Sequence, residues 1–275
     1  MSEASNNDTW SMVDFMVPSH DVELVSDLLW SLGVVAIEER NTSSDHVVLR
    51  TSMGDDPTES VSAVVAAFPS VATEFIHIPR AVADTWRAHA TATKVNESLS
   101  LVPAWLQPEG SGEHLFIEPL DTFGLGNHPT TVLALRLALR TTRRGSSVFD
   151  LGCGSGVLAV GLAKLLQCSV LAYDIADNAR QAVQMNCAIN DVATVQWHHG
   201  IIGTNNDVVL ANILAPVLID ESDAIMNATL VGGTIVLSGM RDEQVERVKS
   251  HFLGCTEVDK DSLDGWTAVV LRREM

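Results

Sequence analysis

The sequence predicts an α/β protein in which a small α+β domain precedes a doubly wound, mostly parallel sheet that ends in an antiparallel hairpin. Two observations support this fold class. Strand-like and helical segments alternate through the second half of the 275-residue chain, and its last two strand-like runs are too close for a crossover helix. With 46% hydrophobic residues, the chain can bury the cores of two domains.

The first 80 residues have the segment order β-α-β-β-α-β. Apolar residues of the first helical segment recur at helical spacing up to Gly33, a residue typical of helix C-caps, and Pro57 precedes the second helical segment. The expected strands are 10–17, 34–39, 46–51 and 74–78, and the expected helices are 21–32 and 58–68. This order predicts a ferredoxin-like domain over residues 1–80.

Residues 81–112 are expected to link the two domains, with a short helix near the start. Their periodicity is weak, and turn-forming and bulky residues accumulate there: Trp86, Pro103, Trp105, Pro108, Gly110 and Gly112. The second domain then covers residues 113–275.

The second domain alternates strands with helices, as a parallel sheet covered on both faces requires. The expected strands are 147–151, 169–174, 194–198, 207–213 and 233–238, and the expected helices are 132–139, 156–166, 177–190, 217–228 and 243–252. Residues 256–260 and 267–272 complete the sheet as an antiparallel hairpin.

A glycine-rich turn, VFDLGCGSG, joins the first of these strands to a helix. Gly152, Gly154 and Gly156 permit a tight turn and a close approach of a ligand to the backbone, and Asp150 can accept hydrogen bonds from an ammonium group. The G-x-G-x-G spacing differs from the G-x-G-x-x-G that usually cradles a pyrophosphate. A tight turn without a ligand is the alternative interpretation.

Two more polar residues end strands of the same predicted sheet. Asp174 comes about 20 residues after Gly152, the offset that places a carboxylate on ribose hydroxyls in βαβ nucleoside sites; an ordinary turn acid is the alternative. Asn212 ends the strand VVLAN, at the same crevice if the sheet is doubly wound. Its uncharged amide can position an amine without holding it protonated.

The loop FGLGNHPTT precedes the first helix of this domain. The hydroxyls of Thr130 and Thr131, with backbone N–H groups, can wrap a ligand's carboxylate, whereas a helix N-cap without a ligand is the alternative. His128, His198 and His199 are expected to be loop residues, with His128 shaping this loop. No group of residues has the spacing of metal ligands.

The order of these motifs resembles the ribosomal protein L11 methyltransferase (PrmA) family: FGLGNHPTT, VFDLGCGSG, LAYDIADNA, VVLANILA and GGTIVLSG. The resemblance covers essentially the whole chain, although Leu125 and Asn127 stand where the family commonly has threonine. It implies a class I methyltransferase (Rossmann-like) fold, S-adenosylmethionine as the cofactor and a substrate-recognition role for residues 1–80. The family's cofactor contacts fall on Thr131, Gly152, Asp174 and Asn212.

The resemblance implies transfer of methyl groups to lysine or N-terminal amino groups of an L11-type ribosomal protein of the large subunit. Asn212 is the expected catalytic residue, and the expected cofactor-binding residues are Thr130, Thr131, Asp150, Gly152, Gly154, Gly156, Asp174 and Asn212. Nucleobase methylation is disfavoured, because Ile-Leu-Ala follows Asn212 and supplies no aromatic ring to stack on a base. Two alternatives stay open: methylation of lysine in another protein, such as the electron-transfer flavoprotein β subunit, and a non-catalytic S-adenosylmethionine-binding module.

The composition of the chain limits which binding partners and which cellular location we expect. A formal charge of −18 repels phosphate backbones, which favours a basic protein substrate over nucleic acid, although acidity can also serve solubility alone. Apolar runs are shorter than a membrane span, and the start MSEASNNDTW is unlike a secretory signal. The four cysteines form no CxxC pair, so we expect reduced thiols and a cytoplasmic protein without metal or membrane contact.

Overall fold

The computed structural model describes residues 9–32, 34, 37–41, 45–53, 57–79, 87, 90–108, 110–120, 122, 124–200 and 205–274. The chain divides into two compact units, residues 1–90 and residues 91–275. Among the described helices, none has the length and apolar character that crossing a lipid bilayer would require.

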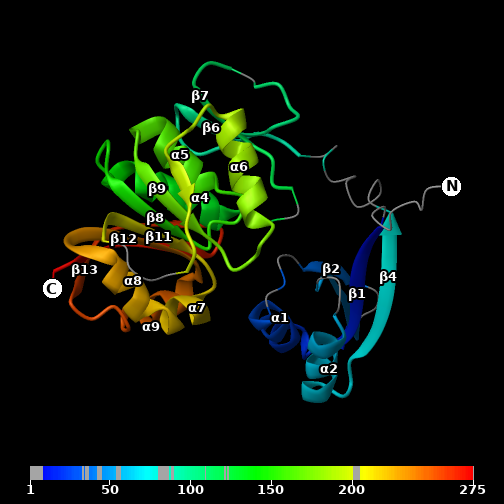
Figure 1. Ribbon diagram of the computed structural model, residues 1–275. Coiled ribbons are helices and arrows are strands. Elements are labelled where there is room, and N and C mark those ends of the chain that lie inside the picture. Colours follow the sequence, from blue (N-terminus) through cyan, green and yellow to red (C-terminus); the bar gives the residue numbers. More distant parts are fainter. Residues whose placement is uncertain are drawn as a thin grey trace. The chain divides into compact units, whose positions relative to one another are not determined.

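Over its described residues, the first unit is a four-stranded antiparallel sheet with two helices (Figure 1). Its elements are β1 (Thr9–Pro18), α1 (Val22–Ser31), β2 (Glu38–Asn41), β3 (His46–Thr51), α2 (Thr58–Ala67) and β4 (Ala72–Pro79), and the strand order is β2-β3-β1-β4. Both helices bury apolar side chains against residues such as Phe15 and Leu49 of the sheet. The described elements follow the order from which a ferredoxin-like domain was predicted, and that assignment stays a prediction. Part of the strand expected at 34–39 lies outside the described residues.

A three-stranded sheet opens the second unit, where the expected linker ends. It consists of β5 (Thr93–Lys94), β6 (Leu99–Pro103) and β7 (Glu113–Ile117), and β6 pairs with β7 in parallel. Leu99, Leu101 and Val102 are buried, so β6 belongs to the core despite its proline-rich surroundings. Residues 91–112 therefore carry more structure than a linker, whereas most of 80–90, with the short helix expected there, lies outside the described residues.

A seven-stranded sheet forms the centre of the second unit, in the order β10-β9-β8-β11-β12-β14-β13. The strands are β8 (Ser147–Leu151), β9 (Ser169–Tyr173), β10 (Val195–Trp197), β11 (Asn206–Asn212), β12 (Thr229–Arg241), β13 (Cys255–Leu263) and β14 (Trp266–Arg273). The first five run parallel, and β14 lies antiparallel between β12 and β13, so the predicted doubly wound sheet with a C-terminal hairpin is confirmed. Strand order reverses between β8 and β11, and sheets of this kind bind ligands at the carboxyl ends of the strands beside such a reversal.

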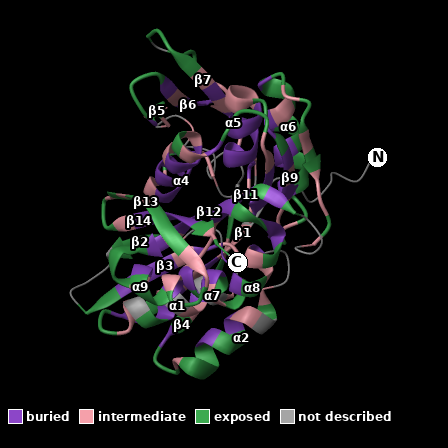
Figure 2. Ribbon diagram, turned by 90° about the vertical axis from the view of Figure 1, so that its left-hand side faces the viewer, coloured by how far each residue is buried: buried purple, intermediate pink, exposed green. Residues whose placement is uncertain are grey.

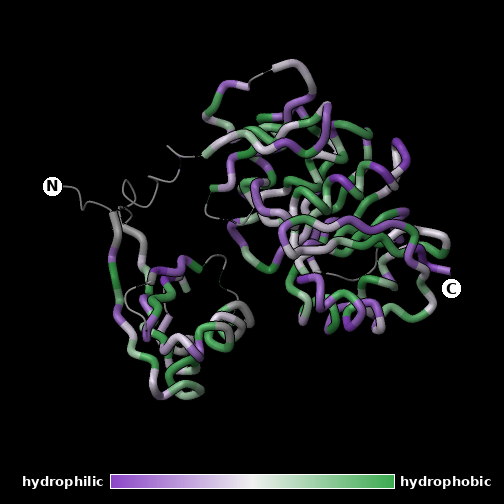
Figure 3. Tube along the Cα trace, turned by 180° about the vertical axis from the view of Figure 1, so that it is seen from behind, coloured by the Kyte–Doolittle hydropathy of each residue, from purple (hydrophilic) through white to green (hydrophobic). Residues whose placement is uncertain are grey.

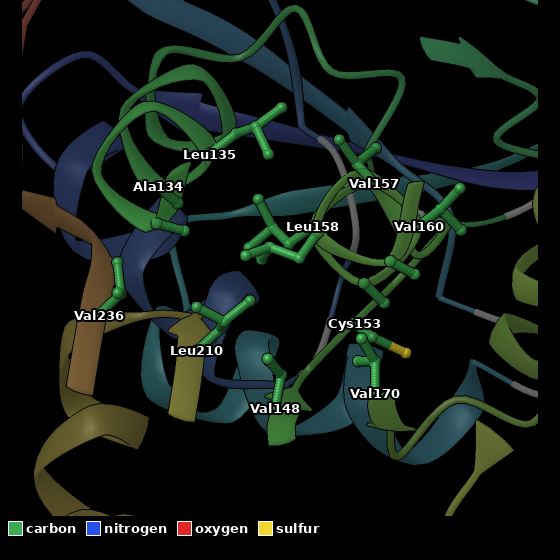
Figure 4. Close-up of a cluster of buried hydrophobic side chains, with 14 of the residues drawn as sticks. Ala134, Leu135, Val148, Cys153, Val157, Leu158, Val160, Val170, Leu210 and Val236 are labelled. Carbon is green, nitrogen blue, oxygen red and sulfur yellow. The ribbon is translucent and has the colours of Figure 1, made fainter. Parts of the chain in front are cut away.

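Helices cover both faces of this sheet (Figures 1 and 2). On one face lie α4 (Pro129–Thr141), α5 (Val157–Leu166) and α6 (Ala179–Ile189), and on the other lie α7 (Ala215–Asp220), α8 (Ser222–Ala228) and α9 (Val245–Lys249). Successive strand residues alternate between the two cores: Val148 packs beneath α4 and α5, and Phe149 packs on the opposite side. Figure 4 shows Ala134 and Leu158 pointing toward Val148 and Leu210 in the first of these cores.

Two expected helices are shorter than the sequence predicted. The helix expected at 217–228 breaks at Glu221 into α7 and α8, and the one expected at 243–252 is the 3-10 helix η2 (Asp242–Gln244) followed by α9. The hydropathy trace in Figure 3 shows hydrophobic and hydrophilic stretches alternating through the second unit. Such alternation identifies elements well and their ends poorly.

Candidate functional site

The glycine-rich turn between β8 and α5 rests on the end of β9. The backbone N–H groups of Gly152 and Cys153 donate to the Tyr173 carbonyl at 2.8 and 3.1 Å. Gly152 has φ +69°, and a Cβ there would lie 2.3 Å from Cγ2 of Ile213. Glycine is therefore required here by the backbone conformation and by Ile213, the residue that follows β11, and the expected approach of a ligand to this turn stays a prediction.

Asp174, directly after β9, contacts the glycine-rich turn with its carboxylate. One oxygen accepts the N–H of Gly154 at 2.8 Å, and the other accepts the N–H of Ala176 at 2.9 Å. The side chain is only partly buried. Each oxygen keeps a lone pair for a further donor, so Asp174 can accept bonds from a ligand while it holds the turn.

Asp150 has a structural partner that the sequence did not reveal. Its side chain is 1% exposed, and Oδ2 accepts the N–H of Ala159 in the first turn of α5 at 3.0 Å. Oδ1 is buried and has no hydrogen-bond partner among the described residues. Burial raises the pKa of Asp150 to about 7, with a smaller contribution from the charge of Asp174. The expected contact with a ligand's ammonium group stays a prediction.

Replacing Asp150 by asparagine is expected to stabilise the protein more at pH 8 than at pH 5. A carboxyl whose pKa is raised by folding favours the unfolded chain once pH exceeds its unfolded value near 4, and this loss of stability levels off above about 7. Asparagine keeps a hydrogen-bond acceptor for the N–H of Ala159 and removes the buried negative charge. The gain in the free energy of unfolding should be larger at pH 8 than at pH 5 by on the order of 3 kcal/mol. Urea unfolding of both proteins at the two pH values measures the difference. Parallel pH dependence would refute the raised pKa.

The first turn of α4, which begins at Pro129 and so contains the two threonines expected in the loop, brings Thr131 to Asn212. Asn212 Nδ2 lies 3.4 Å from Oγ1 of Thr131, the acceptor of a long hydrogen bond. The Thr130 hydroxyl instead lies 2.8 Å from Nδ1 of His128, the N-cap of α4, and its carbonyl accepts the hydroxyl of Ser238. Both threonines are buried, and Thr131 is the one that is hydrogen-bonded to the end of β11. Phe123, also in the predicted loop, lies outside the described residues.

A close backbone crossing fixes the position of Asn212. Gly239 interrupts the regular part of β12 with φ +89°, and a Cβ there would lie 2.2 Å from the carbonyl oxygen of Ile213. Ile213 therefore passes between Gly152 on one side and Gly239 on the other. This crossing sets the direction in which the chain leaves β11 and holds Asn212 at the carboxyl edge of the sheet.

Trp266 and Arg241, which pack near His128, and Ile175 were missed by sequence reasoning. The His128 ring meets Trp266 edge-on at 5.0 Å, and the Arg241 guanidinium lies 4.0 Å from the centre of the Trp266 ring. Burial, with a smaller effect from Arg241, lowers the pKa of His128. Ile175, next to Asp174, is 90% exposed. Its place directly after a predicted ribose contact was the signal that could have identified it as a site residue.

Asn186 and Asn190 of the α6 region were also missed, and both are buried. Asn186 bonds to the backbone of Glu118 and to the carbonyl of Ser155 in the glycine-rich turn. The available signal was their spacing of four residues, because asparagine is an unfavourable residue inside helices unless its amide has partners.

The predicted site residues meet at the carboxyl ends of three neighbouring strands. The turn after β8, Asp174 after β9 and Asn212 at the end of β11 are joined through Gly154 and Ile213. Within the described ranges, no group of three histidine, cysteine or acidic side chains is placed to hold a metal ion. The arrangement offers a carboxylate, an amide and backbone groups to a ligand, at the place where doubly wound sheets bind nucleosides.

Comparison with known proteins decides the family. The profile described as "Ribosomal protein L11 methyltransferase (PrmA)" matches residues 79–274, which include every residue of this site. The chain belongs to the ribosomal protein L11 methyltransferase family. The resemblance inferred from the sequence motifs is confirmed.

Relatives within the PrmA family span different parts of the chain. A "Ribosomal protein L11 methyltransferase" of Halalkalibacterium halodurans is 34% identical over 203 residues, 69% of this chain and 64% of that protein, so the match spans less than two thirds of that relative. One of Methylobacillus flagellatus is 29% identical over 286 residues, 94% of this chain and 97% of that protein.

A solved structure of the PrmA family shares the fold. The ribosomal protein L11 methylase of Lactobacillus delbrueckii subsp. bulgaricus has a TM-score of 0.63 and 26% identity, and the match covers 68% of this chain and all of that one. The expected class I methyltransferase fold of the second unit is confirmed by this likeness and by the strand order.

Proposed function

We propose that this chain is an S-adenosylmethionine-dependent methyltransferase acting on amino groups of ribosomal protein L11. The observation that carries the proposal is the meeting of Asp174, the glycine-rich turn and Asn212 at the strand-order reversal of the sheet. Membership of the PrmA family supports it. We also propose a cytoplasmic location, because ribosomal proteins are made in the cytoplasm.

The residues at the site fit a nucleoside that carries a positive charge and no phosphate. Asp174 has acceptor capacity left for two ribose hydroxyls. The partly exposed carboxylate of Asp174 would repel a pyrophosphate, whereas a sulfonium centre is attracted to carboxylates. Binding of S-adenosylmethionine by the purified chain, measured by calorimetric titration, tests this step, and absence of binding would refute the proposal.

Bound S-adenosylmethionine supplies an activated methyl group, so the protein has to deliver a neutral amine and exclude water. Deprotonating a lysine of ordinary pKa near 10.4 costs about 4–5 kcal/mol at pH 7. Asn212 can accept a hydrogen bond from the amine through its side-chain oxygen while its Nδ2 is held near Thr131. An amide adds no negative charge that would stabilise the protonated amine.

The substrate assignment has two supports. The relatives named above are called ribosomal protein L11 methyltransferases. The chain's formal charge of −18 suits a positively charged protein partner, since opposite charges speed encounter and align the partners. The proposed cofactor-binding residues all lie within residues 91–275, so we assign recognition of the substrate to the first unit, including the predicted domain 1–80.

A shortened chain that lacks residues 1–90 is expected to keep its affinity for S-adenosylmethionine and to lose most methylation of L11. The described cofactor-site contacts lie after the division at Ala90, and productive placement of an amine accounts for several kcal/mol of a barrier. Cofactor titration and radiolabel transfer to L11 are compared with the full chain, after circular dichroism shows that the shortened chain is folded. Transfer at nearly the full rate would rule out recognition by the first unit.

A further inference from the structure

The free edge of β7 is bonded by side chains instead of by another strand. β7 pairs with β6 on one side. On the other side, Asn190 bonds both backbone groups of Phe116, accepting its N–H at 3.0 Å and donating to its carbonyl at 2.7 Å. Asn186 does the same for Glu118, at 2.8 and 2.9 Å. Each amide therefore takes the place of a paired strand residue.

The spacing of the two elements makes this arrangement possible. Residues four apart on a helix are separated by about 6 Å along its axis, and residues two apart on a strand by about 6.6 Å. Asn186 and Asn190 thus match Glu118 and Phe116 one to one. The side chains are 0% and 3% exposed, so each lost partner would leave a buried polar group unpaired.

Asn186 differs from Asn190 because it also reaches the glycine-rich turn. Its Nδ2 donates to the carbonyl of Ser155 at 2.8 Å, in addition to Glu118. The Ser155 hydroxyl in turn donates to the carbonyl of Gly124, in the loop before α4. One buried amide therefore connects the turn that contacts Asp174 with the segment that leads toward Thr131.

We propose that Asn186 is a positioning residue that fixes the glycine-rich turn relative to the loop before α4, and so holds both halves of the cofactor site in register. This inference rests on the proposed function, because it assumes that S-adenosylmethionine binds there. Asn186 lies one helical turn before the end of α6 and acts only through Ser155 and Glu118. Sites whose supporting contacts are lost become too loose to bind well.

The test compares Asn186→Ala with Asn190→Ala, a matched control from the same helix region. Each variant loses two bonds to one residue of the 116–118 segment. Asn186→Ala also loses the bond to Ser155, whereas Asn190→Ala also loses the bonds of Asn190 with Lys164 and with the Asn186 carbonyl, neither of which involves the glycine-rich turn. We expect both to lower the melting temperature. We expect Asn186→Ala to raise the Kd for S-adenosylmethionine about tenfold and Asn190→Ala to change it less than about twofold. KM for the cofactor should rise in the first variant while kcat at saturating cofactor stays near that of the wild type.

A second variant covers the case in which Asn186→Ala does not fold. Ser155→Ala removes the hydroxyl bond to Gly124 and leaves Asn186 in place, and it should raise the Kd about threefold. Two results would overturn the inference: unchanged affinity for S-adenosylmethionine in the variants of Asn186 and Ser155, or a loss of affinity in Asn190→Ala as large as in Asn186→Ala. In both cases, binding by the wild type would still support the proposed function. Failure of the wild type to bind would refute the proposed function and the inference together.

Discussion

Replacing Asp174 by alanine is expected to weaken S-adenosylmethionine binding at least about tenfold. The carboxylate would make charge-assisted hydrogen bonds to ribose hydroxyls, worth about 1.5–3 kcal/mol, and each factor of ten in affinity corresponds to about 1.4 kcal/mol. The structure adds a second cause, since the same carboxylate accepts the N–H of Gly154 and steadies the glycine-rich turn. Calorimetric titration of the two proteins measures the loss.

Two further variants separate these causes. Asp174→Asn keeps one acceptor oxygen and should lose less affinity than Asp174→Ala. Asp177→Ala removes an exposed carboxylate three positions along the chain and controls for the change in net charge. If Asp174→Ala binds the cofactor as tightly as the wild type and Asp177→Ala, then Asp174 is only a turn residue.

Replacing Asn212 by aspartate is expected to lower the rate of methyl transfer at saturating cofactor and neutral pH about 100-fold. A carboxylate at this position would stabilise the protonated form of the acceptor amine and raise its pKa, so less neutral amine would be available. The lost activity should return partly as pH rises. Single-turnover rates measured from pH 7 to pH 10 record both effects.

The matched control for this change is Asn227→Asp in α8, an exposed residue that carries the same added charge. It should leave the rate and its pH profile unchanged. Asn212→Ala, which adds no charge, should slow transfer without moving the pH profile. Equal pH profiles for Asn212→Asp and the wild type would exclude Asn212 from contact with the amine.

Local patterns predicted the regular elements well where side-chain type and burial agree. The strands His46–Thr51 and Ser147–Leu151 have the predicted bounds, because both are runs of mostly apolar or β-branched residues with buried interiors. The start of β12 was missed, since the predicted strand began at Gly233 whereas β12 begins at Thr229. β5 and β6 were missed because residues in and near them, such as Pro103 and Trp105, are typical of loops, and long-range pairing with β7 decides their structure.

The sequence predicted which residues belong to the candidate site, but it predicted few of the contacts between them. The offset of Asp174 from Gly152 and the strand ending at Asn212 follow from the βαβ repeat, so these positions could be read from the chain. The partner of Asp150 in α5 and the crossing of Ile213 depend on how distant segments pack. No local pattern encodes such packing. The spacing of Asn186 and Asn190 was a local signal that their amides have partners, but it does not identify the distant segments that supply them.

The place of β14 in the sheet has a consequence for folding. It follows β13 in the chain yet lies between β12 and β13, so the hairpin formed by β13 and β14 can join the sheet only by docking β14 onto β12. Hairpins form quickly, whereas pairing between distant segments is slow. Docking also brings Trp266 against His128 at the start of α4. During refolding, binding of S-adenosylmethionine should therefore recover no earlier than the docking of β14 onto β12.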